Sequence, residues 1–167
     1  MNKYLILCID DEREVLESVL TDLTMFEQQF DIEGCESVAE AQTFLTQQLE
    51  AGQALALILC DHMMPDIQGV DFLIELNQQA CFQPTKKILL TGQAGLEATI
   101  EAVNLGGLDC YIAKPWQAGQ LQQHVKHHLT QYIIEQEADM MPYAPVLETQ
   151  TIADAWQQRR LEIAAQS

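Results

Sequence analysis

Short, continuously apolar runs alternate along the chain with longer segments in which apolar residues recur every three or four positions. A short apolar run of this kind is typical of a parallel strand that helices cover on both faces. The pattern predicts five strands, at residues 4–9, 30–35, 54–60, 86–91 and 110–113. The run ALALILC at 54–60 is the most hydrophobic, and FDIEGC at 30–35 is the weakest.

The segments between these runs have the period of amphipathic helices. They predict helices at about residues 10–26, 37–50, 69–79 and 96–105, and a longer one from residue 118. Ser37 and Glu40 are placed as a capping box at the start of the second helix. Strands that alternate with helices form right-handed βαβ units. The fold class is therefore α/β, with a doubly wound parallel sheet of five strands and helices on both faces.

The last of these helices keeps its apolar stripe unusually far, to about Asp139, over a length of about 33 Å. MMPYAP, at 140–145, then interrupts it. A final amphipathic segment, 151–165, begins with Thr151 and Asp154 in capping-box order. A helix this short is not stable in isolation, so it must dock on another surface.

These features predict a domain at residues 1–130 and a helical extension or linker at 131–167. Three roles for the extension fit the sequence. It could form a homodimer contact, dock on its own first domain, or lead into a further output domain that is absent from this sequence.

The composition narrows the range of partners. The chain has 167 residues and a formal net charge of −17, which argues against DNA and anionic membrane surfaces, because both are polyanions. The N-terminal apolar run is too short to span a membrane. The five cysteines form no CxxC pair and lie mostly in apolar runs, as is typical of buried thiols in a reducing compartment. We expect a cytoplasmic protein with no direct contact to DNA or membranes.

Polar residues follow four of the five predicted strands. Asp10 and Asp11 come after the first strand, and Asp61 comes after the third. Thr91 closes the fourth strand and Lys114 follows the fifth. Ligands of doubly wound sheets bind outside the carboxyl ends of the strands, so these side chains should converge on one rim.

The charges at this rim predict a metal ion. Two carboxylates about 4 Å apart repel by about 4 kcal/mol at an effective dielectric constant of about 20. One lysine cannot offset three carboxylates, so the site should recruit a divalent cation or raise the pKa of a carboxyl group. Oxygen ligands favour Mg²⁺, with Mn²⁺ as a substitute. Cys60 and His62 flank Asp61 and would suit zinc, but strand alternation points them to the opposite face.

With a cation, Lys114 and Thr91 in place, Asp61 is suited to attack a phosphoryl group. The cation and the ammonium group would neutralise the phosphoryl oxygens while the carboxylate becomes an acyl phosphate. The sequence has no Walker loop, GxGxxG motif or obvious Ser/His/Asp set that would indicate another chemistry.

The segments CIDDE, CDHMMPDIQG, LLTG and GGLDCYIAKPW have consistent spacing, each around the end of a predicted strand. Through them, residues 1–128 resemble the receiver domain of two-component response regulators. The resemblance implies a flavodoxin-like sheet with strand order 2-1-3-4-5. It also implies a signalling switch, not an enzyme, that catalyses only its own phosphorylation and dephosphorylation.

The resemblance assigns roles to the acidic residues. It implies that Asp61 accepts the phosphoryl group of a sensor histidine kinase or a phosphotransfer protein. Asp10, Asp11 and Asp61 would form the Mg²⁺ site, with the backbone carbonyl of Met63 as a further ligand. Asp11 would be the more direct ligand of the acidic pair.

Other residues would respond to the phosphoryl group. Lys114, followed by a cis Pro115, would contact it, and Thr91 would move in to bond it. Tyr111 would rotate inward as the coupled aromatic switch. The fourth helix, fifth strand and fifth helix would then present a changed surface to a downstream protein target.

Two other functions fit parts of this pattern. A Mg²⁺-dependent phosphohydrolase with an aspartyl-phosphate intermediate uses similar groups. Such enzymes typically carry D-x-D on the first strand, however, where this chain has Asp10 and Asp11 side by side. The chain could also be the receiver portion of a larger multidomain signalling protein.

Several candidates also have simpler structural explanations. Asp10 and Asp11 could merely begin a helix, and Tyr111 could merely fill the core. His124 and His128, four residues apart, could bind a metal. No third ligand lies near them in the sequence, so we expect a solvated helix face there.

Overall fold

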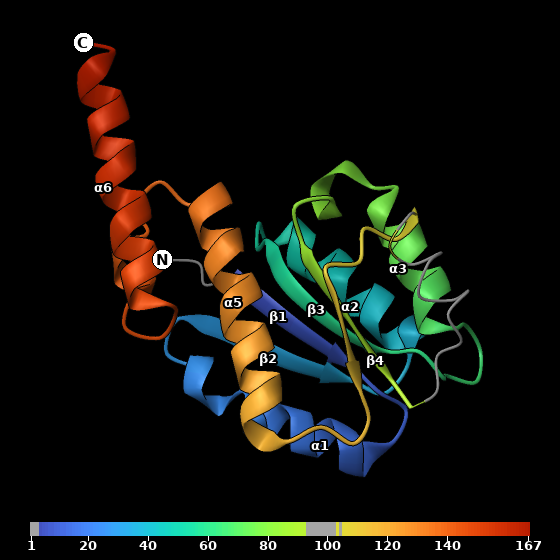
Figure 1. Cartoon of the computed structure of the whole chain (residues 1–167). Coiled ribbons are helices and arrows are strands. Elements are labelled where there is room, and N and C mark those ends of the chain that lie inside the picture. Colours follow the sequence, from blue (N-terminus) through green and yellow to red (C-terminus); the bar gives the residue numbers. More distant parts are fainter. Residues whose placement is uncertain (1–3, 93–102, 104) are drawn as a thin grey trace.

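The computed structural model describes residues 4–92, 103 and 105–167. Within these ranges the chain forms a five-stranded parallel sheet with the order β2-β1-β3-β4-β5 (Figure 1). The strands are β1 (Tyr4–Ile9), β2 (Phe30–Cys35), β3 (Leu55–Asp61), β4 (Lys86–Thr91) and β5 (Cys110–Ala113). The predicted strands, the α/β class and the strand order are confirmed.

Helices connect the strands as expected. They are α1 (Arg13–Asp22), α2 (Val38–Glu50), α3 (Gly69–Asn77), α5 (Ala118–Gln136) and α6 (Thr149–Ala165), with the short 3-10 helices η1 (Thr24–Phe26), η2 (Ala80–Phe82) and η3 (Met141–Tyr143). The first helix ends before the predicted residue 26, because the N–H of Leu23 donates to the carbonyls of both Val19 and Leu20 and the chain tightens into η1. The helix expected at 96–105 lies almost wholly outside the described residues.

The helices form two layers, with α1 and α5 on one face of the sheet and α2 and α3 on the other (Figure 1). The capping box that opens α2 is confirmed. The Ser37 hydroxyl accepts the N–H of Glu40 at 3.1 Å, and the Glu40 carboxylate accepts the N–H of Glu36 at 3.0 Å. Such a cap satisfies backbone donors that the first helical turn leaves without partners.

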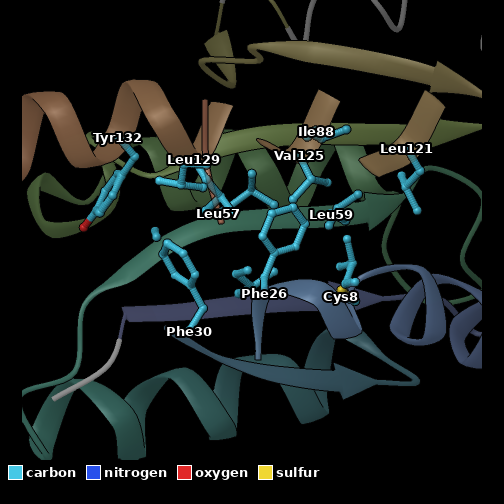
Figure 2. Close-up of a cluster of buried hydrophobic side chains, with 14 of the residues drawn as sticks. Cys8, Phe26, Phe30, Leu57, Leu59, Ile88, Leu121, Val125, Leu129 and Tyr132 are labelled. Atoms are coloured by element: carbon cyan, nitrogen blue, oxygen red, sulfur yellow. The ribbon is translucent and has the colours of Figure 1, made fainter. Parts of the chain in front are cut away.

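A stripe of α5 holds the fifth helix against the centre of the sheet. Leu121, Val125 and Leu129 recur every four residues and are fully buried. They belong to the same core cluster as Leu57 and Leu59 of β3 (Figure 2). Full burial of each such side chain stabilises the fold by about 1.5–3 kcal/mol. This packing fixes the connection between β5 and α5.

The first part of the extension belongs to the same core. Tyr132 and Ile133, in the second half of α5, and Tyr143, in η3, are each at most 3% exposed. The Tyr143 ring lies 5.6 Å from that of Phe30 and 6.1 Å from that of Tyr4. The Tyr4 and Tyr132 rings meet edge to face at 5.3 Å. An aromatic cluster therefore joins the extension to β1 and β2.

The capping box predicted at Thr151 and Asp154 is wrong. α6 begins two residues earlier, at Thr149, and Glu148 at its N-cap makes no side-chain capping hydrogen bond. The Thr149 hydroxyl donates to the carbonyl of Ala144 at 2.7 Å. The contact between the preceding turn and the helix therefore sets where α6 begins.

The second half of α6 projects away from the sheet (Figure 1). Leu161 and Ile163 are more than 60% exposed. Arg159 anchors the middle of the helix, because its guanidinium donates to the carbonyls of Ile134 and Glu137. No helix among the described residues is long and apolar enough to cross a membrane.

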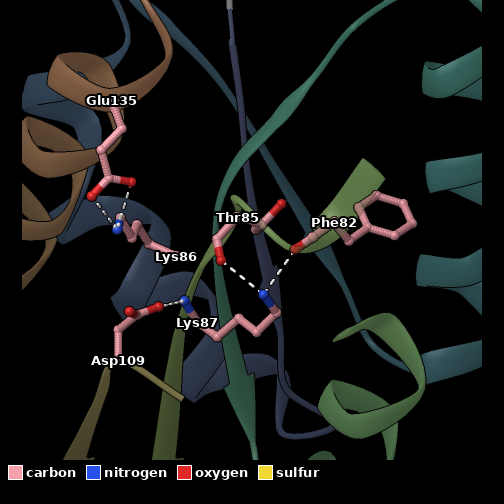
Figure 3. A network of polar contacts seen from close by, with 6 residues as sticks. All are labelled: Phe82, Thr85, Lys86, Lys87, Asp109 and Glu135. Carbon is pink, nitrogen blue, oxygen red and sulfur yellow. Dashed lines mark hydrogen bonds and ion pairs between the residues drawn. The ribbon is translucent and has the colours of Figure 1, made fainter. Parts of the chain in front are cut away.

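A polar network lies where β4 begins (Figure 3). The ammonium group of Lys87, a residue only 1% exposed, donates to the carbonyls of Phe82 at 2.8 Å and Thr85 at 2.9 Å. The backbone N–H of Lys87 donates to the carboxylate of Asp109 at 2.8 Å. These contacts fix the start of β5 against β4.

Candidate functional site

The strand ends bring the predicted polar residues to one edge of the sheet. Asp10 follows β1, Asp61 ends β3, Thr91 ends β4 and Lys114 follows β5. Thr91 is paired in register with Ala113, and the N–H of Lys114 donates to the Thr91 carbonyl at 2.8 Å. The carboxyl ends of these parallel strands therefore share an edge, as the sequence predicted.

Lys114 lies at the centre of this cluster. Its Nζ lies 2.8 Å from Oδ2 of Asp10 and 2.9 Å from Oδ1 of Asp61. The other oxygen of Asp10 accepts the backbone N–H of Glu12 at 2.9 Å. Asp10 is 1% exposed and Asp61 is 3% exposed, so one ammonium group bridges two buried carboxylates from different strands.

The third carboxylate belongs to Asp11, which is exposed. Each of the three aspartates offers an oxygen, and these oxygen atoms lie within 4.8 Å of one another. Octahedral Mg²⁺ holds oxygen ligands at about 2.0–2.1 Å and usually keeps several waters. An all-oxygen cluster that opens to solvent at Asp11 fits this ion after small side-chain movements.

The surroundings of Asp61 and Lys114 shift the pKa values of both side chains. Burial raises the pKa of Asp61 above its ordinary value of 3.8, and the carboxylates of Asp10 and Asp11 act in the same direction against the effect of Lys114. Burial alone would lower the pKa of Lys114, but its hydrogen bonds to Asp10 and Asp61 outweigh burial and raise it. Lys114 therefore remains a cation, and the site keeps an excess of negative charge that favours a divalent ion.

Gly69 allows the chain to close tightly behind Asp61. Its N–H donates to the carbonyl of His62 at 2.9 Å, at the point where α3 begins. A Cβ at this position would collide with the backbone carbonyl of Asp61. We did not predict this role from the sequence, although a glycine at the first residue of a helix, close after a strand end, is a signal for such an approach.

The region that contains this site also matches a known family. Residues 6–126 match the family described as the response regulator receiver domain. The chain belongs to this family. The predicted site residues lie at the end of the sheet where doubly wound folds bind their ligands.

Curated relatives of this receiver domain are longer proteins. Response regulator Rre1 of Synechocystis sp. is 30% identical over 124 residues, which cover 74% of this chain and 51% of Rre1. The hydrogenase transcriptional regulatory protein HoxA of Bradyrhizobium diazoefficiens is 29% identical over 137 residues, which cover 80% of this chain and 26% of HoxA. The matched region is thus only a quarter to a half of these relatives.

Solved structures support the same fold. A CheY-like receiver domain protein from Methanospirillum hungatei is 27% identical, with a TM-score of 0.67 over 80% of this chain and 99% of that one. The signal receiver domain of an HD domain-containing protein from Pseudomonas fluorescens is 24% identical, with a TM-score of 0.65 over 78% of this chain and 98% of that one. The second likeness concerns the fold alone.

The other predicted site residues lie around the acidic cluster of the receiver domain. Thr91 is 5% exposed, whereas Tyr111 is 58% and Met63 is 63% exposed. The simpler explanation of Tyr111 as a core residue is therefore wrong. The peptide bond between Lys114 and Pro115 is cis, as expected.

Zinc at this rim is not supported by the described residues. Cys60 and His62 flank Asp61, but the group of described side chains that could hold a metal at this rim consists of Asp10, Asp11 and Asp61. The oxygen cluster therefore stands without sulfur or imidazole donors. This agrees with the expected choice of Mg²⁺ over Zn²⁺.

Proposed function

We propose that the chain is the phospho-accepting receiver of a two-component system, with Asp61 as the acceptor. The observation that carries this proposal is the bridge of Lys114 between Asp10 and Asp61 beside the exposed carboxylate of Asp11. A nucleophilic carboxylate, a fixed cation and a cluster of oxygen ligands are the groups that phosphoryl transfer needs. The donor would be the phosphohistidine of a sensor histidine kinase or of a phosphotransfer protein.

The proposed reaction replaces the phosphorus–nitrogen bond of the donor by a phosphorus–oxygen bond to Asp61. An oxygen of Asp61 attacks the phosphorus atom, the bond to the donor imidazole breaks, and the electron pair of that bond leaves with the imidazole. Lys114 stays with Asp10 and turns from Asp61 Oδ1 to an oxygen of the transferred group. Asp10, Asp11 and Asp61, with the backbone carbonyl of Met63 as a further ligand, would hold a Mg²⁺ ion, which would supply positive charge against the phosphoryl oxygens.

The proposed switch uses the neighbouring strands. The hydroxyl of Thr91, at the end of β4, would donate a hydrogen bond to the phosphoryl group on Asp61. Tyr111, now 58% exposed on β5, would turn inward and change the surface that a downstream protein target contacts. Phosphorylation would thus shift an equilibrium between two arrangements of this face.

Intact mass spectrometry tests the acceptor. The reduced 167-residue chain is treated with a small-molecule phosphodonor with Mg²⁺ and, separately, with a chelator. We expect one added phosphoryl group only with Mg²⁺, and none on the Asp61→Asn variant. Asp66→Asn, which changes an exposed aspartate in the loop after Asp61, is the matched control and should be labelled like the wild type. Equal labelling of Asp61→Asn would refute the proposal.

The place of this receiver in a whole protein is a separate proposal. Relatives such as HoxA are named transcriptional regulators and extend far beyond the matched region. We propose that this receiver likewise acts on an output component through protein contacts, in the cytoplasm. The net charge of −17 argues against direct DNA contact by the described chain itself.

We also propose that the receiver function is confined to about residues 1–130, with 131–167 as a helical extension that adds stability or a homodimer contact. Light scattering of the 167-residue chain with and without the phosphodonor measures the homodimer. A mass of one chain in both states would exclude it.

A further inference from the structure

A second cluster of metal-ligating side chains lies away from the acidic rim, between β5 and α5. His124 and His128 lie one turn apart on α5, and Cys110 is the first residue of β5. The Sγ atom of Cys110 lies 3.5 Å from Nδ1 of His124. Donor atoms of all three residues lie within 4.8 Å of one another.

This arrangement corrects the expectation of a solvated helix face. His124 and His128 are both half-buried, and Cys110 of β5 lies against them. The third donor that the sequence did not reveal comes from β5, which reaches α5 only through the folded sheet. A Cys and two His residues in contact are a far more specific feature than a His pair alone.

The donor set determines the kind of ion. One thiolate and two imidazoles suit a borderline-soft transition metal, and Zn²⁺ binds such ligands in tetrahedral geometry. With Zn–S of about 2.3 Å and Zn–N of about 2.0–2.1 Å, a tetrahedral site separates sulfur from nitrogen by about 3.5 Å. The observed distance of 3.5 Å between Cys110 Sγ and His124 Nδ1 equals this sulfur-to-nitrogen separation. We propose that Cys110, His124 and His128 form a Zn²⁺ site with a fourth position open to water or to a ligand from a partner.

The elements that carry these residues are held by strand pairing and by core packing. Cys110 is paired with Ile88 in the sheet register, and Val125 and Leu129, on the neighbouring stripe of α5, are fully buried. The His127 ring contacts the His128 ring edge to face at 5.2 Å. The backbone on both sides of the cluster is therefore fixed, and the third donor, within 4.8 Å of the other two, would complete the tetrahedron by side-chain rotation.

Metal binding at this cluster would be coupled to the release of a proton. Burial lowers the pKa of His128, against the opposing effect of Asp109. Burial and Asp109 both raise the pKa of Cys110. Binding of Zn²⁺ would therefore displace the thiol proton, which is released to solvent as the Zn–S bond forms.

The site is independent of the proposed phosphorylation chemistry, because none of its ligands lies at the acidic rim. The two clusters also differ in donor type, with oxygen atoms alone at Asp10, Asp11 and Asp61 and sulfur and nitrogen here. Mg²⁺ prefers the former and Zn²⁺ prefers the latter. Excess Mg²⁺ can thus fill the acidic cluster while this site is tested.

Titration with Co²⁺, a spectroscopic substitute for Zn²⁺, tests the proposal on the reduced 167-residue chain in excess Mg²⁺. We expect a thiolate-to-cobalt charge-transfer band that saturates at one equivalent and disappears when Zn²⁺ displaces Co²⁺. Cys110→Ser should abolish the band, and His128→Gln should weaken binding at least about tenfold. Cys81→Ser removes an exposed cysteine outside the cluster and should leave the titration unchanged.

A band that persists in Cys110→Ser, or no band in the wild type, would overturn the proposal and leave only a hydrogen-bonded Cys–His pair. A second measurement needs no variant. X-ray absorption of the wild-type chain with one equivalent of Zn²⁺ should show sulfur and nitrogen in the first coordination shell, whereas a shell of oxygen alone would equally reject the site.

Discussion

At the scale of single residues, Lys114 is the cation on which the acidic cluster depends. Its ammonium group contacts two carboxylates whose residues are at most 3% exposed. Removal of one partner from a buried ion pair leaves uncompensated charge, which costs more than the pair contributed.

We predict that Lys114→Met lowers the free energy of unfolding by about 1–3 kcal/mol in metal-free buffer, because Asp10 and Asp61 then repel each other without a counter-charge. Mg²⁺ should restore part of this loss by supplying positive charge to the same carboxylates. Urea denaturation with chelator and with Mg²⁺ measures both effects. Lys126→Met, in α5, is the control and should lose less than about 0.5 kcal/mol. A variant as stable as the wild type in chelator would show that the bridge does not hold the carboxylates together.

Lys87 provides a pH-dependent test at the same scale. Burial lowers its pKa from 10.5 to about 8, with Lys86 acting in the same direction and Asp109 in the opposite one. Between about pH 8 and 10.5 the unfolded chain therefore binds more protons than the folded one. The contribution of Lys87 to the free energy of unfolding therefore rises with pH across that window, by at most about 1.4 kcal/mol per pH unit.

We predict that the stability of the wild type relative to Lys87→Met rises by about 2–3 kcal/mol between about pH 7 and pH 10. The comparison with the variant cancels groups that titrate equally in both proteins. Chemical denaturation of the two chains at a series of pH values measures the difference. If the free energies of unfolding of the two proteins changed equally with pH, the lowered pKa of Lys87 would be wrong.

The sequence predicted Asp10, Asp61 and Lys114 because each follows a recognisable strand and parallel strands end at a common edge. It could not predict the burial of Lys87, since a lysine at the start of a strand is usually solvated. Nor could it predict Cys110 as a partner of the histidines. That contact depends on how β5 packs against α5, which periodicity within one element does not encode.

At the scale of elements, two segments with the same capping signal behave differently. Ser37 caps α2, whereas Thr151 lies inside α6 and caps nothing. The motif is local, but the start of α6 is set by the turn that packs before it and by the bond from Thr149 to Ala144. A pattern of four residues contains no information on such a contact.

We predict that Ser37→Ala lowers the free energy of unfolding by about 1 kcal/mol, because the N–H of Glu40 loses its acceptor. Thr151→Ala is the matched control and should change stability by less than about 0.5 kcal/mol. Thermal and urea unfolding of both variants measure the difference. If both substitutions destabilised the chain equally, the capping assignment from the structure would be wrong.

At the scale of the whole molecule, the hydrophobic cluster on the α1 and α5 face of the sheet continues from the receiver domain into the start of its extension. The sequence predicted an amphipathic extension that must dock, but an apolar stripe does not identify the surface that it covers. In the structure, Met140, Tyr143 and Ile152 are at most 3% exposed within the cluster that holds α1 and α5. Residues 161–167 are by contrast all exposed.

This asymmetry predicts different effects of two truncations. A chain that ends at Gln136 keeps all of α5 but uncovers the rings of Tyr4 and Phe30, so it should lose at least about 3 kcal/mol of stability and associate at high concentration. A chain that ends at Arg160 keeps the buried contacts and the Arg159 anchor, and should unfold like the full chain. Urea denaturation and light scattering measure both outcomes. Equal stability of the two truncated chains would mean that the aromatic cluster adds nothing to the fold, and the extension would then be free to serve another surface.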